Sequence, residues 1–134
     1  MSRAQKTPLE RRIEQQGLVD VCSVDSTIFV SLMYARADNF TGRILYHDLH
    51  TAYLLPETAR ALRKAQTELQ RRHPDLSLKV YDATRPMSVQ QHMWDVVKGT
   101  NRSIYVSNPA RGGGLHNYGL AVDITLCWRR NVYD

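Results

Sequence analysis

The chain has few cysteines and no long apolar run, and each shortage excludes a class of protein. Its two cysteines, Cys22 and Cys127, lie far apart and form no C-x-x-C pair, so we expect reduced thiols and no disulfide framework. The sequence contains no stretch of 18 apolar residues, which argues against a transmembrane helix. Residues 1–16 are polar and lack the apolar core of a signal peptide. We therefore expect a cytoplasmic protein, or a periplasmic one whose leader has been removed, and no membrane partner.

The motifs of several common function classes are also missing. The glycine run 112–114 does not complete a G-x-G-x-x-G pattern, and no Lys-Ser/Thr pair follows a glycine loop, so nucleotide binding is not favoured. No G-x-S-x-G serine-hydrolase elbow is present. The chain is basic, with 18 lysines and arginines against 13 acidic residues. However, Glu57 and Glu68 interrupt the basic residues of one predicted helix, and no aromatic residues are interleaved with them, so we expect no nucleic-acid partner.

Length and patterning indicate a mixed fold. At 134 residues and 43% hydrophobic content, the sequence fits a single small domain over residues 1–134. Helical and extended apolar periodicities alternate along the chain, which favours an α+β fold with a small antiparallel or mixed sheet and helices packed on one side. We expect helices over 56–72 and 88–99, and strands over 27–35, 76–82 and 120–126.

The segment 112–126 carries the clearest chemical signal. It places His116 in a glycine-rich loop and Asp123 seven residues later in an apolar strand. A nitrogen ligand on a turn and an oxygen ligand on a rigid strand favour a divalent metal site, most simply zinc. The alternatives are a solvated histidine and an aspartate that caps a turn. The face of the strand opposite Asp123 is expected in the core, since side chains alternate; it consists of Leu120, Val122, Ile124 and Leu126.

A second metal pair and a long loop also have to be considered. His47 and His50 are three residues apart and could share one side of a helical turn, but no third ligand lies near them in the sequence.

The loop 101–114 has no strong periodicity and leads directly to His116. Loops of this length inside a small domain are often functional.

The end of the predicted strand 76–82 supplies another charged pair. Asp82 has the same parity as the core-facing residues of this strand, so its carboxylate needs a partner. Arg85 follows three residues later, and Pro86 biases it towards an extended conformation. Two interpretations remain open: a buried ion pair that fixes the turn, or a functional role for Arg85.

Four ordered motifs resemble a known family. His116 and Asp123, with Gly119 and Ala121 between them, are similar to the S-x-H-x-x-G-x-A-x-D signature of the zinc D,D-peptidases related to D-alanyl-D-alanine dipeptidase. The resemblance extends over about residues 19–126, and the agreeing segments are 34–42, 81–86 and 122–126.

The resemblance implies a fold, an activity and four site residues. The implied fold is the hedgehog/D,D-peptidase type. The implied reaction is zinc-dependent hydrolysis of the small dipeptide D-Ala-D-Ala in cell-wall precursor metabolism, and a related alternative is a D,D- or L,D-carboxypeptidase that acts on peptidoglycan stem peptides. His116 and Asp123 correspond to ligands of one zinc ion per site, Arg85 to the residue that stabilises the transition state, and Tyr34 to an aromatic residue beside the substrate.

Two departures from the family pattern have consequences. Gly114 stands where the signature has a serine, so any hydrogen bond of that hydroxyl is absent. The later E-x-W-H-type motif, which supplies a general base and a third ligand, is missing, because no glutamate follows Glu68 and no histidine follows His116. We therefore expect the natural chain to continue beyond residue 134, or a partner chain, such as another copy in a homo-oligomer, to complete the site. The alternative is a zinc-binding pseudoenzyme or an inactive fragment that serves as a binding module.

Overall fold

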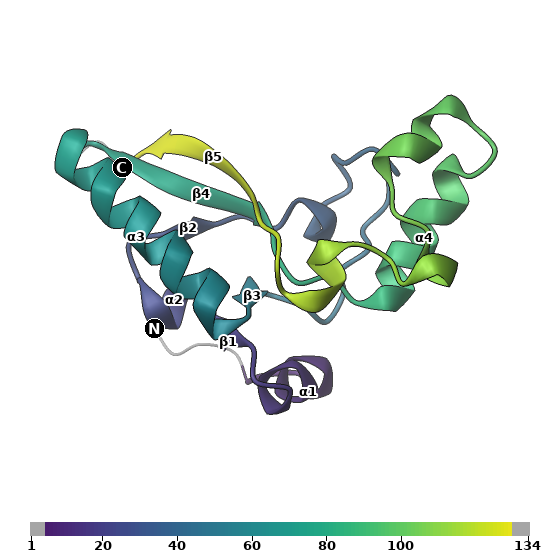
Figure 1. Ribbon diagram of the computed structural model, residues 1–134, viewed down its shortest axis with the longest axis horizontal. Coiled ribbons are helices and arrows are strands. Elements are labelled where there is room, and N and C mark those ends of the chain that lie inside the picture. The colour runs from purple at the N-terminus through teal and green to yellow at the C-terminus, as the bar shows by residue number, and fades with distance from the viewer. Residues whose placement is uncertain (1–4, 130–134) are drawn as a thin grey trace.

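The computed structural model describes residues 5–129 and shows an α+β fold with small mixed sheets (Figure 1). Its helices and strands are α1 (Pro8–Gln15), β1 (Val19–Asp20), α2 (Val21–Val24), β2 (Phe29–Val30), β3 (Tyr53–Leu54), α3 (Pro56–Arg72), β4 (Leu76–Asp82), α4 (Met87–Val97) and β5 (Asp123–Trp128). Short 3-10 helices cover Met33–Ala35, Asn101–Tyr105, Pro109–Arg111 and Leu115–Tyr118.

Strand β4 is the centre of the larger sheet. The strand order is β2-β4-β5, with β2 parallel and β5 antiparallel to β4, while β1 and β3 form a separate antiparallel pair. Leu78 and Val80 of β4 are buried in the core. Figure 1 shows this sheet and α3 at one end of the molecule and α4 at the other, with the segments that follow β4 and precede β5 running between them.

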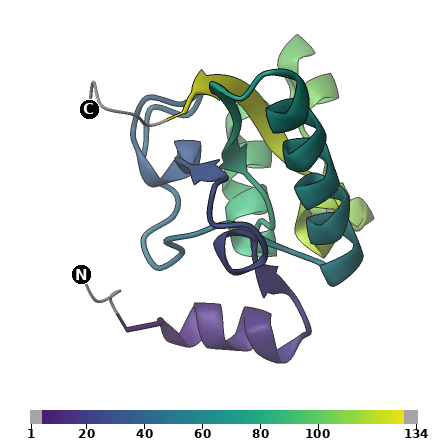
Figure 2. The ribbon, with the colours of Figure 1, turned by 90° about the vertical axis from the view of Figure 1, so that its left-hand side faces the viewer.

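Helix α3 covers one face of the sheet. Pro56 begins the helix, at a position whose N–H would have no partner within the helix. Two arginines in the last turn interact favourably with the negative end of the helix dipole. Its buried Gln66 donates to Ser77 Oγ at 2.7 Å and accepts from the Leu78 backbone N–H at 2.8 Å, which joins the helix to β4. Figure 2 shows α3 alongside the sheet, with α1 lying apart below it. None of the helices in residues 5–129 has both the length and the apolar character needed to cross a membrane.

Two sequence-based expectations for strands are wrong in part. The predicted strand 27–35 is extended only at Phe29–Val30, because its pairing with the parallel β4 stops after Ser31 donates to the Val80 carbonyl at 2.8 Å. The chain then turns into the 3-10 helix at Met33–Ala35.

The apolar face predicted for 120–126 is not in the core. Leu120, Ile124 and Leu126 are exposed, and only Val122 packs partly against the core. The physical reason is position: β5 is an edge strand that pairs only with β4, and nothing within residues 5–129 covers this face. The strand also begins later than predicted, at Asp123. The predictions for 56–72, 76–82 and 88–99 agree with α3, β4 and α4 within two residues.

Candidate functional site

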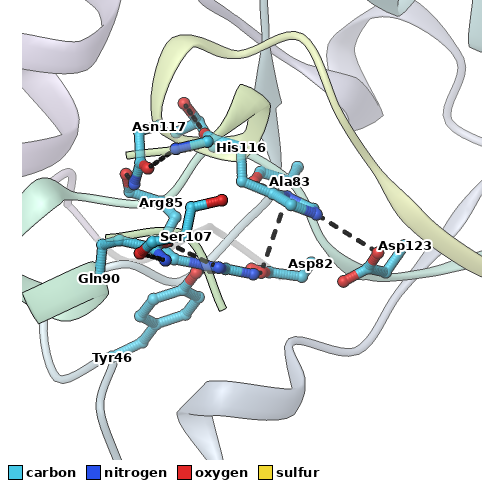
Figure 3. Close-up of polar contacts among 11 residues, drawn as sticks. Tyr46, Asp82, Ala83, Arg85, Gln90, Ser107, His116, Asn117 and Asp123 are labelled. Carbon is cyan, nitrogen blue, oxygen red and sulfur yellow. Dashed lines mark hydrogen bonds and ion pairs between the residues drawn. The ribbon is translucent and has the colours of Figure 1, made fainter. Parts of the chain in front are cut away.

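The site lies where β4 ends and β5 begins. Asp82 and Asp123 are opposite each other in the antiparallel pairing of these strands. The loop that carries His116 is attached to the segment after β4, since the Arg85 N–H donates to the His116 carbonyl at 2.9 Å and Asn117 Nδ2 donates to the Arg85 carbonyl at 2.9 Å. Figure 3 shows the four side chains Asp82, Arg85, His116 and Asp123 brought together in this way.

Gly119 allows the loop to turn into the strand. It has φ of +72°, a left-handed conformation in which a side chain is strained, and an added Cβ would lie 3.1 Å from the Leu55 backbone nitrogen. The Leu55 N–H in turn donates to the Gly119 carbonyl at 3.1 Å. This close approach anchors the loop against the start of α3, so that His116 is presented from a fixed backbone.

The imidazole of His116 is oriented by a backbone carbonyl. Its Nδ1 lies 2.8 Å from the Ala83 carbonyl oxygen, which can only accept, so Nδ1 carries the proton. Nε2 then faces Asp123 Oδ1 at 3.3 Å. In the neutral imidazole Nε2 is an acceptor, so its lone pair and a carboxylate oxygen converge on the same space. Such a pair is stable only when a proton or another cation lies between the two atoms.

The pKa values of the pair reflect this convergence. Burial lowers the pKa of His116, but the hydrogen bonds to Asp123 and to the Ala83 carbonyl outweigh it and raise the pKa above its ordinary value of 6.5. The hydrogen bond from His116 lowers the pKa of Asp123, against a smaller opposing effect of burial. Without a metal ion, the pair therefore favours a proton on Nε2 more than a free imidazole does.

The same geometry fits a divalent metal ion. Ligand atoms about 2.0–2.2 Å from a tetrahedral zinc ion are about 3.3–3.6 Å apart, which matches the separation of His116 Nε2 and Asp123 Oδ1. A metal-binding histidine usually donates its other N–H to a carbonyl or carboxylate, as Nδ1 does to Ala83. The residues that the sequence predicts as metal ligands thus have the spacing and the tautomer that a metal site needs.

Asp82 is close to the pair but differs from it in chemistry. It forms a cluster with His116 and Asp123 in which the possible ligand atoms lie within 4.8 Å of one another. Both of its oxygens already accept hydrogen bonds, Oδ1 from the Tyr46 hydroxyl at 2.5 Å and Oδ2 from Arg85 at 2.6 and 3.2 Å. It also lies nearest to Nδ1, the side of the ring turned away from Asp123, at 3.8 Å. These contacts make Asp82 a support for Arg85.

Arg85 is held on three sides. Its Nε and Nη2 donate to Asp82, its Nη1 donates to Gln90 Oε1 at 2.8 Å, and its guanidinium carbon lies 5.4 Å from the centre of the Tyr34 ring. Burial raises the pKa of Asp82 against the opposing effect of Arg85, so the ionised carboxylate depends on its two partners. The ion-pair interpretation is confirmed, because Arg85 forms a buried pair with Asp82. Arg85 also lines the pocket described next, and its functional role stays a prediction.

The predicted residues line one small pocket. Its volume is about 240 Å³, below the range of about 300–1,000 Å³ common for small-molecule sites, so it fits a small ligand. Tyr34, Arg85, His116 and Asp123 all line it. An adjoining pocket of about 280 Å³ shares the rings of Tyr34 and Phe40 with it. A larger hollow of about 460 Å³ borders α1 and touches neither His116 nor Asp123.

Sequence reasoning missed the residues that support the site. Tyr46 and Gln90 hold Asp82 and Arg85, and the Ala83 carbonyl sets the tautomer of His116. The one available signal was Gln90, a polar residue beside the apolar positions of helix 88–99. The rival pair is not part of a ligand cluster in residues 5–129: His50 Nδ1 lies 3.6 Å from Glu10, and His47 is exposed.

Comparisons with known proteins agree with the resemblance. The sequence model of a family described as D-ala-D-ala dipeptidase matches residues 14–129. A similar curated protein is the D-alanyl-D-alanine dipeptidase of Escherichia coli strain K12, which is 31% identical over 109 residues, covering 81% of this chain and 53% of the relative. The chain therefore spans about half the length of the curated relative it matches. Because the family model extends over most of the sequence, from before β1 to the end of β5, the chain belongs to the D-ala-D-ala dipeptidase family.

Proposed function

We propose that this chain forms part of a zinc-dependent peptidase that hydrolyses the D-Ala-D-Ala dipeptide in cell-wall precursor metabolism. One observation carries the proposal: His116 Nε2 and Asp123 Oδ1 converge at 3.3 Å in a pocket that Arg85 also lines. Membership of the family and the dipeptidase relative support the reaction type. When bound, zinc would lower the pKa of a water molecule towards about 7 and polarise the scissile carbonyl.

The chain's own residues would hold the ion and stabilise negative charge. His116 and Asp123 would bind the ion. Of the five N–H groups of a guanidinium, three of those of Arg85 donate to Asp82 and Gln90, which leaves two for a substrate. Donors held in place before the reaction are the kind that stabilise a developing oxyanion most effectively. Tyr34 would form an aromatic wall beside the substrate.

The resemblance in sequence motifs implies that a third protein ligand and a general base complete this chemistry. Within residues 5–129 the ligand cluster contains only Asp82 beside the predicted pair, and Asp82 is already engaged by Tyr46 and Arg85. We propose that polypeptide outside the described residues, either a further segment or a partner chain, supplies both groups.

Two alternatives are favoured by specific observations. Within residues 5–129 the ligand cluster contains no glutamate that could act as the general base, which favours a zinc-binding protein without catalytic activity. The adjoining pocket, which shares Tyr34 and Phe40, favours a carboxypeptidase that acts on longer peptidoglycan stem peptides.

The experiment that separates these functions measures zinc content and hydrolysis together. Zinc per chain and release of D-alanine from D-Ala-D-Ala and from a D-Ala-D-Ala-ending pentapeptide are recorded for the unsubstituted chain, for His116→Ala and for His47→Ala. The proposal expects zinc near one per chain and hydrolysis of the dipeptide, both lost in His116→Ala and kept in His47→Ala. Zinc without hydrolysis supports the non-catalytic alternative, and preference for the pentapeptide supports the carboxypeptidase. Zinc binding that survives in His116→Ala contradicts the assigned site.

A further inference from the structure

Ser107, a residue of the loop between α4 and His116, occupies the space beside Gly114. We infer that the Ser107 hydroxyl binds the substrate, and that Gly114 is a glycine because Ser107 lies where a side chain at position 114 would lie. This inference rests on the proposed function, since it assigns a substrate contact in the same pocket.

The backbone of Gly114 does not itself require glycine. Its φ of −130° and ψ of −176° are extended values that any residue adopts. A Cβ added there would lie 2.6 Å from Ser107 Oγ and 3.2 Å from Ser107 Cβ, both closer than side chains normally approach. In the observed conformation of Ser107, a side chain at position 114 would therefore clash with the serine. The signature serine at this position and Ser107 compete for one volume, and this chain places its hydroxyl there from the other loop segment.

Ser107 is fixed relative to Arg85. Its carbonyl oxygen accepts a hydrogen bond from Gln90 Nε2 at 2.9 Å, and the Oε1 of the same buried Gln90 accepts from Arg85 Nη1 at 2.8 Å. Figure 3 shows Gln90 between these two partners. One amide group thus holds both the guanidinium of Arg85 and the backbone of Ser107.

The hydroxyl of Ser107 is available for a ligand. Ser107 is exposed, and within the described part of the chain its hydroxyl has no hydrogen-bond partner that a ligand would have to displace. Ser107 lines the same pocket as His116 and Asp123. A hydroxyl can donate to a carbonyl or carboxylate oxygen and accept from an amide N–H, all of which a short peptide offers. Because such a contact exists before the reaction starts, we expect it to contribute to binding more than to turnover.

The test measures binding and hydrolysis separately. Titration calorimetry on the zinc-loaded full chain, with a D-Ala-D-Ala analogue whose scissile amide is replaced by a non-hydrolysable link, should give a Kd that is about three- to tenfold higher for Ser107→Ala, the loss expected for one neutral hydrogen bond. Zinc content should stay unchanged, and Ser88→Ala, an exposed serine at the start of α4, should bind as the unsubstituted chain does. An unchanged Kd in Ser107→Ala overturns the inference and leaves the proposed function intact. Binding that weakens in Ser107→Ala, without hydrolysis by any form, supports the inference and overturns the proposed reaction; absence of dipeptide binding by the unsubstituted chain overturns the inference.

A positional exchange tests the steric part. Gly114→Ser should lower the Tm of the metal-free chain and weaken dipeptide binding, because two side chains then compete for one space. The double variant Ser107→Gly with Gly114→Ser should recover both properties, since it moves the hydroxyl without adding volume. Effects that simply add in the double variant contradict the inference that the two positions are coupled.

Discussion

Two carboxylates that face each other across the ends of β4 and β5 have opposite environments. Asp82 is 1% exposed and accepts hydrogen bonds from Tyr46 and Arg85. The side chain of Asp123 is 54% exposed, and within residues 5–129 it pairs with His116. The first carboxylate is fully satisfied by protein groups, while the second is paired with an atom that is itself a potential ligand. The difference separates the rigid part of the site from the part that a bound ion would complete.

The largest effect on stability is expected from a substitution of Asp82, the buried carboxylate. Asp82→Asn should lower the free energy of unfolding by about 3–5 kcal/mol, because it leaves the Arg85 cation buried without a counter-charge. Urea denaturation of the metal-free chain measures the change. Asp38→Asn, which removes a solvent-exposed partner of Arg36, is the control and should change stability by less than about 1 kcal/mol. Equal losses in the two variants would show that burial does not distinguish the pairs.

Removing Arg85 tests whether the partner of Asp82 contributes to the rate of hydrolysis. Arg85→Ala should slow turnover of D-Ala-D-Ala by about two orders of magnitude, which is the typical effect of losing one oxyanion donor. Zinc content should remain near that of the unsubstituted chain, since Arg85 does not touch the ligand atoms of the pair. Steady-state kinetics with metal analysis measures both quantities, and Arg63→Ala on the exposed face of α3 serves as the control. Complete loss of zinc in Arg85→Ala would favour a purely structural role.

A smaller effect is expected from a substitution that removes one hydrogen bond to Asp82 and keeps its charge. Tyr46→Phe deletes the hydroxyl that donates to Asp82 and should destabilise the chain by about 1–2 kcal/mol. Thermal unfolding compares it with Tyr81→Phe, a half-buried tyrosine of β4. Equal stability of Tyr46→Phe and the unsubstituted chain would contradict the importance of this hydrogen bond.

The smallest effect on stability is expected from the pair formed by His116 and Asp123. The pKa of His116 is raised, so in the metal-free chain its contribution to stability is present below pH 6.5 and is lost as the pH rises through the higher pKa of the folded state. The pKa of Asp123 is lowered, so its contribution is present above pH 3.8 and is lost at lower pH. Because the Asp123 side chain is more than half exposed, we expect the pair to contribute less than about 1 kcal/mol between these limits.

Unfolding free energies over this pH range, compared between the unsubstituted chain and Asp123→Asn, measure that contribution. Zinc affinity should change in the opposite direction to the pair's stability, rising with pH as the proton leaves His116. Zinc binding that is independent of pH between 5 and 8 would contradict His116 as a ligand.

The sequence predicted the residues that belong to local motifs. His116 and Asp123 are seven residues apart in one loop and strand, and Arg85 follows a strand that the flanking Pro74 and Pro86 delimit, so spacing alone placed them in the right elements. The supports could not be found in this way. Tyr46 reaches Asp82 across 36 residues of sequence, and such a contact exists only once the chain has folded.

The strands show the same limit. Alternation of side chains correctly placed the residues of 120–126 on two faces, but alternation does not say what covers a face, and the apolar one is exposed. The predicted strand 27–35 was too long because its length is set by where its partner β4 stops pairing. Local patterns therefore predicted element type better than burial or extent.

The uncovered edge strand β5 contains a tryptophan whose fluorescence depends on what covers the strand. Trp128, at the end of β5, is 72% exposed, so its indole emits in a water-like environment, while Trp94 in α4 is partly buried. Any polypeptide that packed on the exposed apolar side of β5 would shield this indole and shift its fluorescence to shorter wavelength. In a Trp94→Phe variant, the emission of the remaining tryptophan would thus follow, in real time and without a label, whether another segment or chain assembles on this face.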